Sequence, residues 1–249
     1  MLEIKNALFS YGKQLVLDGF SAGFQKGKLT CIIGQNGCGK STLLKTALGI
    51  LPLTQGEIAL DGKNLNEMNR IEIARKIAYL PQEKKTPDMT VFQMVLHGRF
   101  PYLSYPRRYA KRDMEIANHA MTSVGIFEQK DKPLYTLSGG MRQNAYIAMA
   151  LAQDTDYILL DEPTTHLDIA HQLELMNMLR KLAKGGKGIV TVMHDLPLAF
   201  EFADEILVIQ NGKLKAQQRP GELCNSSVIH EIFSVKMHRI GDTGKYYYA

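Results

Sequence analysis

The feature that most constrains this chain is a glycine-rich stretch between a strand pattern and a helix pattern. Residues 34–42, Gly-Gln-Asn-Gly-Cys-Gly-Lys-Ser-Thr, match the spacing GxxxxGK[ST]. The apolar run 29–33 before it predicts a buried strand, and residues 41–48 after it predict a helix. Glycines let backbone N–H groups turn inward around a phosphate, and the helix N-terminus adds positive potential. A plain glycine-rich turn is the alternative, but the flanking elements favour a phosphate-binding loop.

Side chains at and beyond the end of this loop extend the prediction to chemistry. Lys40 is expected to reach the β- and γ-phosphates of a nucleotide, and Ser41 to ligate Mg²⁺. A second apolar strand, 157–160, ends in Asp161 and Glu162. The carboxyl ends of parallel strands meet at the ligand-binding edge of an α/β sheet. We therefore expect Asp161 to be the second magnesium ligand and Glu162 to be the general base for water. Two acids that merely cap a helix are the alternative, which Pro163 directly after them disfavours.

A third apolar strand, 188–193, ends in His194 at the same predicted edge. A single histidine is usually a structural residue, but this position beside the expected γ-phosphate favours a functional role.

The order of predicted elements indicates an α/β fold with a helical insertion. Apolar strands at 29–33, 77–80, 157–160 and 188–193 alternate with helical patterns, which predicts a parallel sheet covered on both faces. Helices are expected at 90–97, 110–124 and from Ser138 to Gln153, with an irregular loop at 100–112. Strands 205–210 and 213–217 flank Asn211-Gly212, a strong hairpin signal. We expect one domain over 1–249, with a core of 1–87 and 156–249 and a helical subdomain of 88–155.

Composition excludes several classes of protein. The 249 residues carry a formal net charge of +5, which is short of a nucleic-acid-binding footprint. Three cysteines without CxxC spacing suggest a reducing, cytosolic compartment. The N-terminal residues lack a secretory pattern, and no apolar run reaches the ~18 residues of a spanning helix. A role at a membrane would therefore require a membrane partner.

The stretch Leu-Ser-Gly-Gly at residues 137–140 begins the third helix of the predicted insertion. Ser138 is expected to cap this helix. One cap does not require the two glycines that follow, Gly139 and Gly140, so a close approach to their backbone is expected.

Taken in order, these motifs resemble the ATP-binding subunit of ABC transporters over essentially the whole chain. The matching positions are 34–42 (Walker A), Gln82 (Q-loop), 137–143 (signature), 157–161 with Glu162 (Walker B and catalytic glutamate), 165–168 (D-loop) and His194 (switch histidine). The resemblance implies a P-loop NTPase core with an N-terminal antiparallel β subdomain and an inserted α-helical subdomain.

The resemblance also implies how the subunit works. Two copies associate head to tail around two ATP molecules, and hydrolysis is coupled to transport through separate membrane permease subunits and, indirectly, a substrate-binding protein. Catalysis would involve Glu162, His194, Gln82 and Lys40, and Mg²⁺ would be held by Ser41, Gln82 and Asp161. The residues implied to contact ATP are Tyr11 on adenine, Gly34, Gln35, Asn36, Gly37, Cys38, Gly39, Lys40, Ser41 and Thr42 from one copy, and Ser138, Gly139, Gly140 and Asp168 from the other. The subunit would lie peripherally on the cytoplasmic face of the membrane.

Finer similarity at 96–103, 147–153 and 167–172 is to the subfamily that imports iron–siderophore, haem and cobalamin-type chelates. The sequence is also compatible with three other functions. These are an importer of a different cargo, a soluble ABC ATPase that acts on nucleic acid or the ribosome, and a nucleotide-binding regulator without turnover. No nucleic acid partner is expected, because the chain lacks the second ATP-binding domain or long coiled-coil insertion usual in that class.

Several of these residues have simpler explanations. Tyr11 could be an ordinary strand aromatic, and Asp168 could be an acid favoured at a helix start. Cys38 could be a reactive thiol beside the helix N-terminus. His166 and His171 lack the i, i+4 spacing of a helical zinc site. The basic run 107–112 is expected to be a solvated loop, with contact to lipid headgroups or a partner as the alternative.

Overall fold

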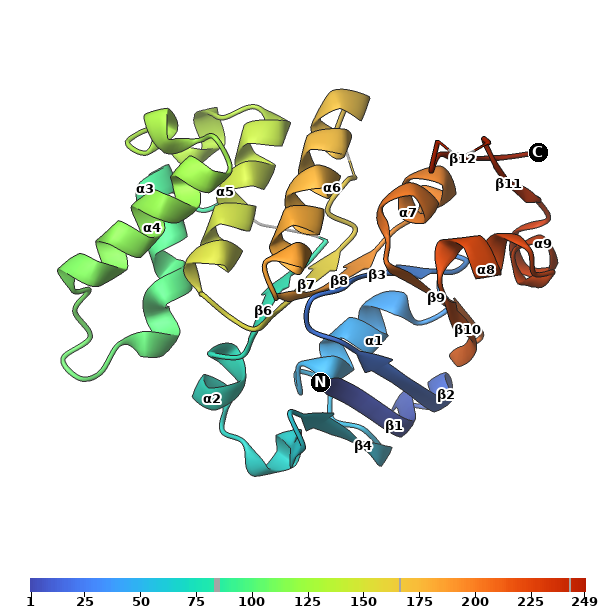
Figure 1. The fold of residues 1–249 in the computed structure, drawn as a ribbon. Helices are drawn as coiled ribbons and strands as arrows, with labels where there is room; N and C mark the ends of the chain where they lie inside the picture. Colours follow the sequence, from blue (N-terminus) through green and yellow to red (C-terminus); the bar gives the residue numbers. More distant parts are fainter. Residues whose placement is uncertain (83–85, 166, 242) are drawn as a thin grey trace.

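The computed structural model describes residues 1–82, 86–165, 167–241 and 243–249. Its central element is a six-stranded sheet of order β10-β9-β3-β8-β7-β6, in which only the β9–β10 pair is antiparallel (Figure 1). The strands are β3 (Leu29–Ile33), β6 (Ile77–Leu80), β7 (Tyr157–Asp161), β8 (Gly188–Val192), β9 (Glu205–Gln210) and β10 (Lys213–Gln218). The predicted parallel sheet is thus confirmed, and β3 lies inside it between β8 and β9.

A second, antiparallel sheet of order β2-β1-β4-β5 lies below the first in Figure 1. It contains β1 (Leu2–Tyr11), β2 (Gln14–Phe24), β4 (Gln55–Leu60) and β5 (Lys63–Asn64). Helix α1 (Lys40–Ala47) follows β3, and α2 (Arg70–Ala74) precedes β6. This is the antiparallel β subdomain that the family resemblance implied.

Two hydrophobic clusters lie on opposite faces of the six-stranded sheet. Side chains alternate along a strand, so Ile32 belongs to the cluster with α1 and the antiparallel sheet, whereas Cys31 and Ile33 belong to the other. The second cluster includes residues of α5 (Gly139–Ala152), α6 (Ile169–Lys184) and α7 (Leu196–Phe202). Both faces are therefore buried, as uninterrupted apolar strands predict.

Helices α3 (Val91–Leu96), α4 (Lys111–Ser123) and α5 lie together at one side of the molecule (Figure 1). Here the sequence interpretation was partly wrong, because residues 100–102, the start of the expected loop, belong to a 3₁₀ helix, His97–Tyr102. Its cause is Arg99, which is buried, pairs with Asp113 (Nε–Oδ1 3.0 Å) and donates to the carbonyl of Ala152 (2.9 Å). A Cβ on Gly98 would lie 2.2 Å from the carbonyl oxygen of Met149, so this segment packs directly on α5.

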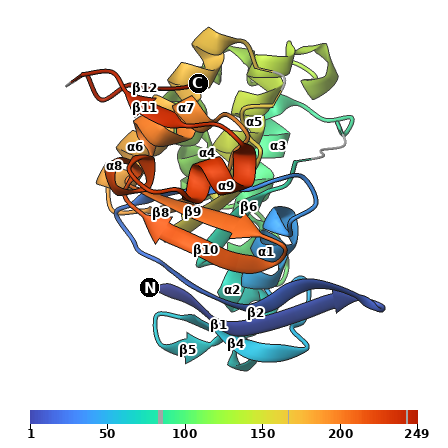
Figure 2. The same ribbon diagram turned by 90° about the vertical axis from the view of Figure 1, so that its right-hand side faces the viewer.

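The C-terminal residues form small elements that the sequence interpretation did not identify. They are α8 (Pro220–Cys224), α9 (Val228–Phe233), β11 (Met237–Arg239) and β12 (Tyr246–Tyr248), at the end of the molecule that faces the viewer in Figure 2. Among the described residues, no helix has the length and apolar character needed to cross a membrane. The boundaries proposed at residues 88 and 155 stay a prediction.

Candidate functional site

The glycine-rich loop connects β3 to α1 and turns tightly around Lys40. The Lys40 ammonium group donates to the carbonyl oxygens of Gly34 (2.8 Å) and Gln35 (2.9 Å) inside the loop. Gly37 and Gly39 have φ of +77° and +106°, which a side chain would strain. The loop therefore has the conformation that the GxxxxGK[ST] spacing predicts, with a charged amine across it.

Gly34 and Cys38 pack against each other within the loop. A Cβ on Gly34 would lie 2.7 Å from Cys38 Sγ and 2.3 Å from the carbonyl oxygen of Ile209 on β9. Cys38 is buried, and burial raises the pKa of its thiol despite the nearby Lys40. Burial and the raised pKa both argue against the hypothesis of a reactive thiol at Cys38, because the thiolate is the nucleophilic form.

The end of β7 places a carboxylate beside the first turn of α1. Ser41 Oγ donates to Asp161 Oδ1 at 3.0 Å, and Tyr79 Oη lies 3.4 Å from Oδ2. Asp161 is buried, and burial raises its pKa, although the hydrogen bond from Ser41 opposes the shift and the nearby Glu162 adds to it. A hydroxyl and a carboxylate that face each other are hard oxygen donors of the kind that suit Mg²⁺. The sequence motifs did not include Tyr79, which belongs to β6.

The next residue, Glu162, has a backbone conformation that is uncommon for a non-glycine residue. Its φ is +51°, and its side chain is mostly buried. Gln82 Nε2 donates to Glu162 Oε2 at 2.6 Å, and His194 Nε2 lies 2.5 Å from Oε1. The carboxylate is thus held between residues that follow β6 and β8, the neighbours of β7 on either side. Thr165 Oγ1, 3.4 Å from Oε2, is a further contact that the sequence did not suggest.

Several of these residues, among them Lys40, Ser41 and Glu162, line a pocket of about 610 Å³. Its wall combines the glycine-rich loop, the start of α1, the antiparallel sheet and the carboxylate cluster: Tyr11, Gln14, Val16, Asn36, Gly37, Gly39, Lys40, Ser41, Thr42, Gln82, Glu162 and His194. Tyr11 is half-exposed and packs edge-on against Phe9 (4.8 Å between ring centroids), so it presents ring surface at the pocket edge. Most of the residues that were predicted to contact ATP from within one chain therefore line this pocket.

Gln35 contributes differently from its neighbours in the loop. Its side-chain amide donates to the carbonyl oxygen of Ile232 on α9 at 2.7 Å. The side chain is therefore used to attach the C-terminal segment to the loop, and only the Gln35 backbone is left to face a phosphate.

The signature residues do not line the pocket of their own chain. Ser138 is the N-cap of α5 and accepts a hydrogen bond from the backbone N–H of Met141 (3.3 Å), as predicted. Ser138 and Gly139 are exposed, and no described atom lies within 4 Å of a Cβ built on Gly139. A Cβ on Gly140 would instead lie 3.3 Å from the imidazole of His171 on α6. His171 is a residue that the motif analysis did not connect with this stretch.

Asp168 is also outside the pocket, at the start of α6. It is the N-cap and accepts from the backbone N–H of His171 (2.9 Å), while the His171 Nδ1 lies 2.8 Å from its carboxylate. These hydrogen bonds lower the pKa of Asp168. The zinc alternative for His166 and His171 cannot be followed further, because His166 lies outside the described residues.

Comparisons with known proteins agree with this geometry. A family model described as ABC transporter matches residues 17–165. The petrobactin import ATP-binding protein FpuD of Bacillus anthracis is 41% identical over 94% of this chain and 87% of that protein. The ferric enterobactin transport ATP-binding protein FepC of Escherichia coli is 40% identical over 93% of this chain and 86% of that protein.

A solved structure of a metal-chelate type ABC transporter in an inward-facing conformation matches with a TM-score of 0.85 and 26% identity, over 99% of this chain and 95% of that chain. A glycine-rich loop on a parallel sheet, with an acidic strand end opposite it, defines a nucleotide-binding ATPase. More particularly, the chain belongs to the ATP-binding subunits of ABC transporters, and it is accordingly an ATP-binding ATPase.

Proposed function

We propose that this chain is the ATP-hydrolysing subunit of a membrane importer for an iron–siderophore or related metal chelate. The observation that supports ATP hydrolysis is the position of the Glu162 carboxylate. Gln82 and His194 hold this carboxylate at the pocket that the phosphate loop lines. The names of the relatives at 38–41% identity, which include petrobactin, enterobactin and hydroxamate import proteins, support the cargo class. They favour import over the alternative of an ATPase that acts on nucleic acid.

In this proposal the residues of one chain bind the nucleotide and prepare the water. Tyr11 stacks on the adenine, the amides of residues 34–42 bind the phosphates, and Lys40 exchanges its loop carbonyls for phosphate oxygens. Ser41 and Asp161, with the side-chain oxygen of Gln82, would hold Mg²⁺, which when bound neutralises phosphate charge. Glu162 accepts the proton of the attacking water, and His194 and Gln82 keep its carboxylate in place.

A second copy completes the site in this proposal. Ser138, Gly139 and Gly140 do not line the pocket of their own chain, and Ser138 and Gly139 are exposed at the N-terminus of the 14-residue helix α5, with Gly140 partly buried beside them. An exposed N-terminus with bare amides attracts an anion. The partner's ATP is that anion in a head-to-tail dimer, with Asp168 beside it, and dimer closure acts on separate permease subunits at the cytoplasmic face of the membrane.

Glu162→Gln tests the ATPase mechanism. This variant should lose at least about 100-fold in turnover, since a positioned general base contributes 10²–10⁴-fold, and it should accumulate as a dimer with ATP in size-exclusion chromatography. Glu174→Gln, an exposed acid on α6, is the matched control and should leave turnover unchanged. Wild-type turnover in Glu162→Gln would remove Glu162 as the base.

The cargo class needs a separate experiment. Uptake of labelled iron, supplied as catecholate, hydroxamate and citrate-type chelates, should fall for one class when the gene is deleted, and return with the wild-type gene but not with Glu162→Gln. Unchanged uptake of every chelate would contradict the proposed cargo while leaving the ATPase assignment intact.

A further inference from the structure

We infer that His171 is a positioning residue that fixes the signature stretch, residues 138–140, relative to the loop that ends at Asp168. The inference rests on the proposed function, because it concerns how one chain presents these groups to the nucleotide of its partner.

The first observation is the contact between His171 and Gly140. A Cβ on Gly140 would lie 3.3 Å from His171 Cδ2 and 3.6 Å from both Cγ and Nε2, so three ring atoms face this glycine. Real Cβ contacts are rarely that close, and the neighbour on Gly140 is a planar ring rather than a flexible chain end. The imidazole of His171 in the same chain therefore leaves little room for a side chain on Gly140, whereas the space beside Gly139 is open.

The opposite edge of the ring is held by Asp168. The carboxylate oxygens of Asp168 both lie 2.8 Å from His171 Nδ1, and Oδ1 also accepts from the His171 backbone N–H at 2.9 Å. These contacts fix the direction of the imidazole on the first turn of α6. One ring thus connects the cap of α6 to the first turn of α5.

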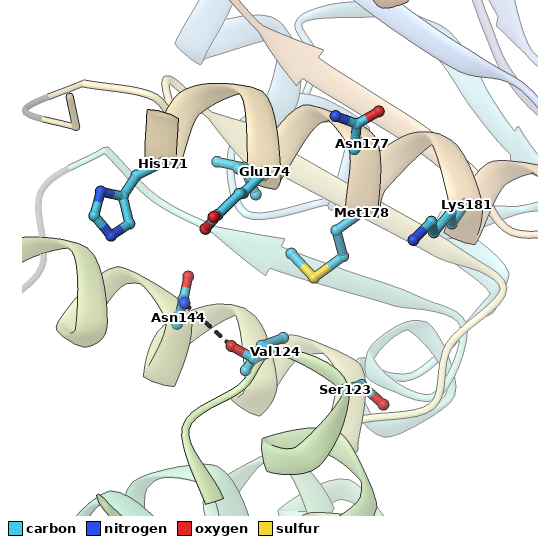
Figure 3. A pocket seen from close by; sticks show the side chains of 9 residues that line it. Ser123, Val124, Asn144, His171, Glu174, Asn177, Met178 and Lys181 are labelled. Atoms are coloured by element: carbon cyan, nitrogen blue, oxygen red, sulfur yellow. Dashed lines mark hydrogen bonds between the residues drawn. The ribbon is translucent and has the colours of Figure 1, made fainter. Parts of the chain in front are cut away.

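Beyond this point the two helices are separated. A groove of about 450 Å³ lies between α6 and the segment formed by α5 and the end of α4, and its lining includes His171, Glu174, Asn177, Met178, Asn144 and Val124. Figure 3 shows the His171 ring extending from α6 toward α5 at one end of this groove. The ring therefore bridges a gap that the neighbouring side chains leave open.

Three hydrogen bonds from Gln143 and Gln172 hold residues of the segment that precedes Asp168. Gln143 on α5 donates to the carbonyl oxygen of Pro163 (2.8 Å), directly after Glu162. Gln172 donates to the carbonyl oxygens of Thr164 (3.3 Å) and Leu167 (3.1 Å). Pro163 is thus attached to α5, Thr164 and Leu167 are attached to α6, and His171 is the contact between the two helices that lies nearest the signature glycines. The consequence is that residues 138–140 and Asp168 reach the partner as one unit.

Three substitutions separate the two contacts of the ring. His171→Ala removes both, His171→Asn retains a donor near the Nδ1 position, and His171→Phe retains the ring over Gly140. In the Glu162→Gln background, His171→Ala should raise the protein concentration needed for half-maximal ATP-dependent dimer by about tenfold, equivalent to about 1.4 kcal/mol. ATP binding to the monomer, measured with a fluorescent analogue, should not change. His171→Phe should recover more of the dimer than His171→Asn does.

Asn177→Ala is the matched control, because Asn177 lines the same groove and its side chain donates to the carbonyl oxygen of Leu173 within its own helix. It should dimerise like the parent. Dimerisation of His171→Ala at the parental concentration would overturn the inference. If Glu162→Gln itself never dimerises with ATP, the proposed function fails instead, so the two failures are distinguishable.

A stability measurement tests the Gly140 contact without any nucleotide. The change in melting temperature caused by Gly140→Ala should be more destabilising in the wild-type protein, where the new methyl group lies 3.3 Å from the imidazole, than in His171→Ala, where the ring is absent. Equal shifts in both backgrounds would show that the ring does not restrict Gly140 and would overturn the inference.

Discussion

At the scale of single residues, the site combines two carboxylates whose surroundings differ. Asp161 is buried behind Ser41, whereas Glu162 turns into the pocket because its backbone has φ of +51°. A left-handed conformation at a non-glycine residue costs about 1–3 kcal/mol. That conformation aims the second carboxylate at Gln82 and His194 instead of continuing the strand direction of β7. The strained backbone of Glu162 therefore turns its side chain into the pocket.

The burial of Asp161 leads to a prediction on stability. Because burial raises its pKa, the folded protein binds this proton more tightly than the unfolded chain. This proton stabilises the folded protein fully below 3.8, the ordinary pKa of an aspartate, and the stabilisation is lost as the pH rises through the raised pKa of Asp161. Without nucleotide and Mg²⁺, Asp161→Asn should therefore be more stable than the wild type at pH 7, with a gap that closes on acidification. Urea unfolding over a pH series measures this.

The exposed Asp131→Asn is the control for the Asp161 experiment and should show no such gap. Addition of ATP and Mg²⁺ should stabilise the wild type more than Asp161→Asn. A gap that stays constant from pH 4 to pH 7 would contradict the assignment of the effect to the Asp161 proton.

At the scale of elements, the glycine-rich loop depends on a helix at the other end of the chain. Gln35 donates to the carbonyl oxygen of Ile232 on α9, and Gly34 packs under β9. Phe233 and Val235 also line a pocket beside His194. The C-terminal segment thus contacts the phosphate loop and lines a pocket together with His194, which pairs with Glu162.

Gln35→Ala should weaken nucleotide binding although its side chain does not face the phosphates. The loss of one hydrogen bond corresponds to about 0.5–1.5 kcal/mol, so we expect the dissociation constant for ATP to rise about two- to tenfold. Calorimetric titration measures it. Gln55→Ala, at an exposed glutamine on β4 outside the pocket, is the control and should leave ATP binding unchanged; an equal effect in both variants would refute a specific role for the contact with α9.

Arg99 should be the most sensitive position of the helical region. Arg99 and Asp113 are 7% and 13% exposed, and removal of one partner from a buried ion pair costs about 3–5 kcal/mol. Arg99→Ala should lower the free energy of unfolding by that amount in urea titrations. Arg107→Ala, in the exposed basic run, should change it by less than about 0.5 kcal/mol; comparable losses would show that Arg99 has no special structural role.

Elements with long or strictly apolar patterns could be predicted from the sequence. β3, β6 and β9 have the predicted limits, since each is bounded by glycine, proline, asparagine or charged residues. The elements after residue 218 were missed because helices of five or six residues and strands of three carry no measurable period. The convergence of Glu162 and His194 followed from the ends of the apolar strands, whereas Gln82 was implied only by the family resemblance. The contacts Gln35–Ile232 and His171–Gly140 join residues on separate elements, and no local pattern encodes them.

At the scale of the whole molecule, the pocket of one chain lacks the signature residues that the mechanism requires. The rate of ATP hydrolysis per chain should therefore fall as the protein is diluted below the dimer dissociation constant, because the fraction of complete sites falls. Turnover should be followed together with the mass of the species by light scattering. A constant rate per chain in verified monomers would contradict the proposed dimer.

The position of β3 also determines when this protein can acquire its site during synthesis. β3 pairs with β8 and β9, and its loop is attached to α9, so its supports lie more than 150 residues further along the chain. The ribosome makes the phosphate-binding motif within the first 42 residues. A nascent chain halted before residue 188 would carry the complete motif yet lack both neighbouring strands. Nucleotide binding should therefore appear late in translation, when the last strands and α9 have emerged.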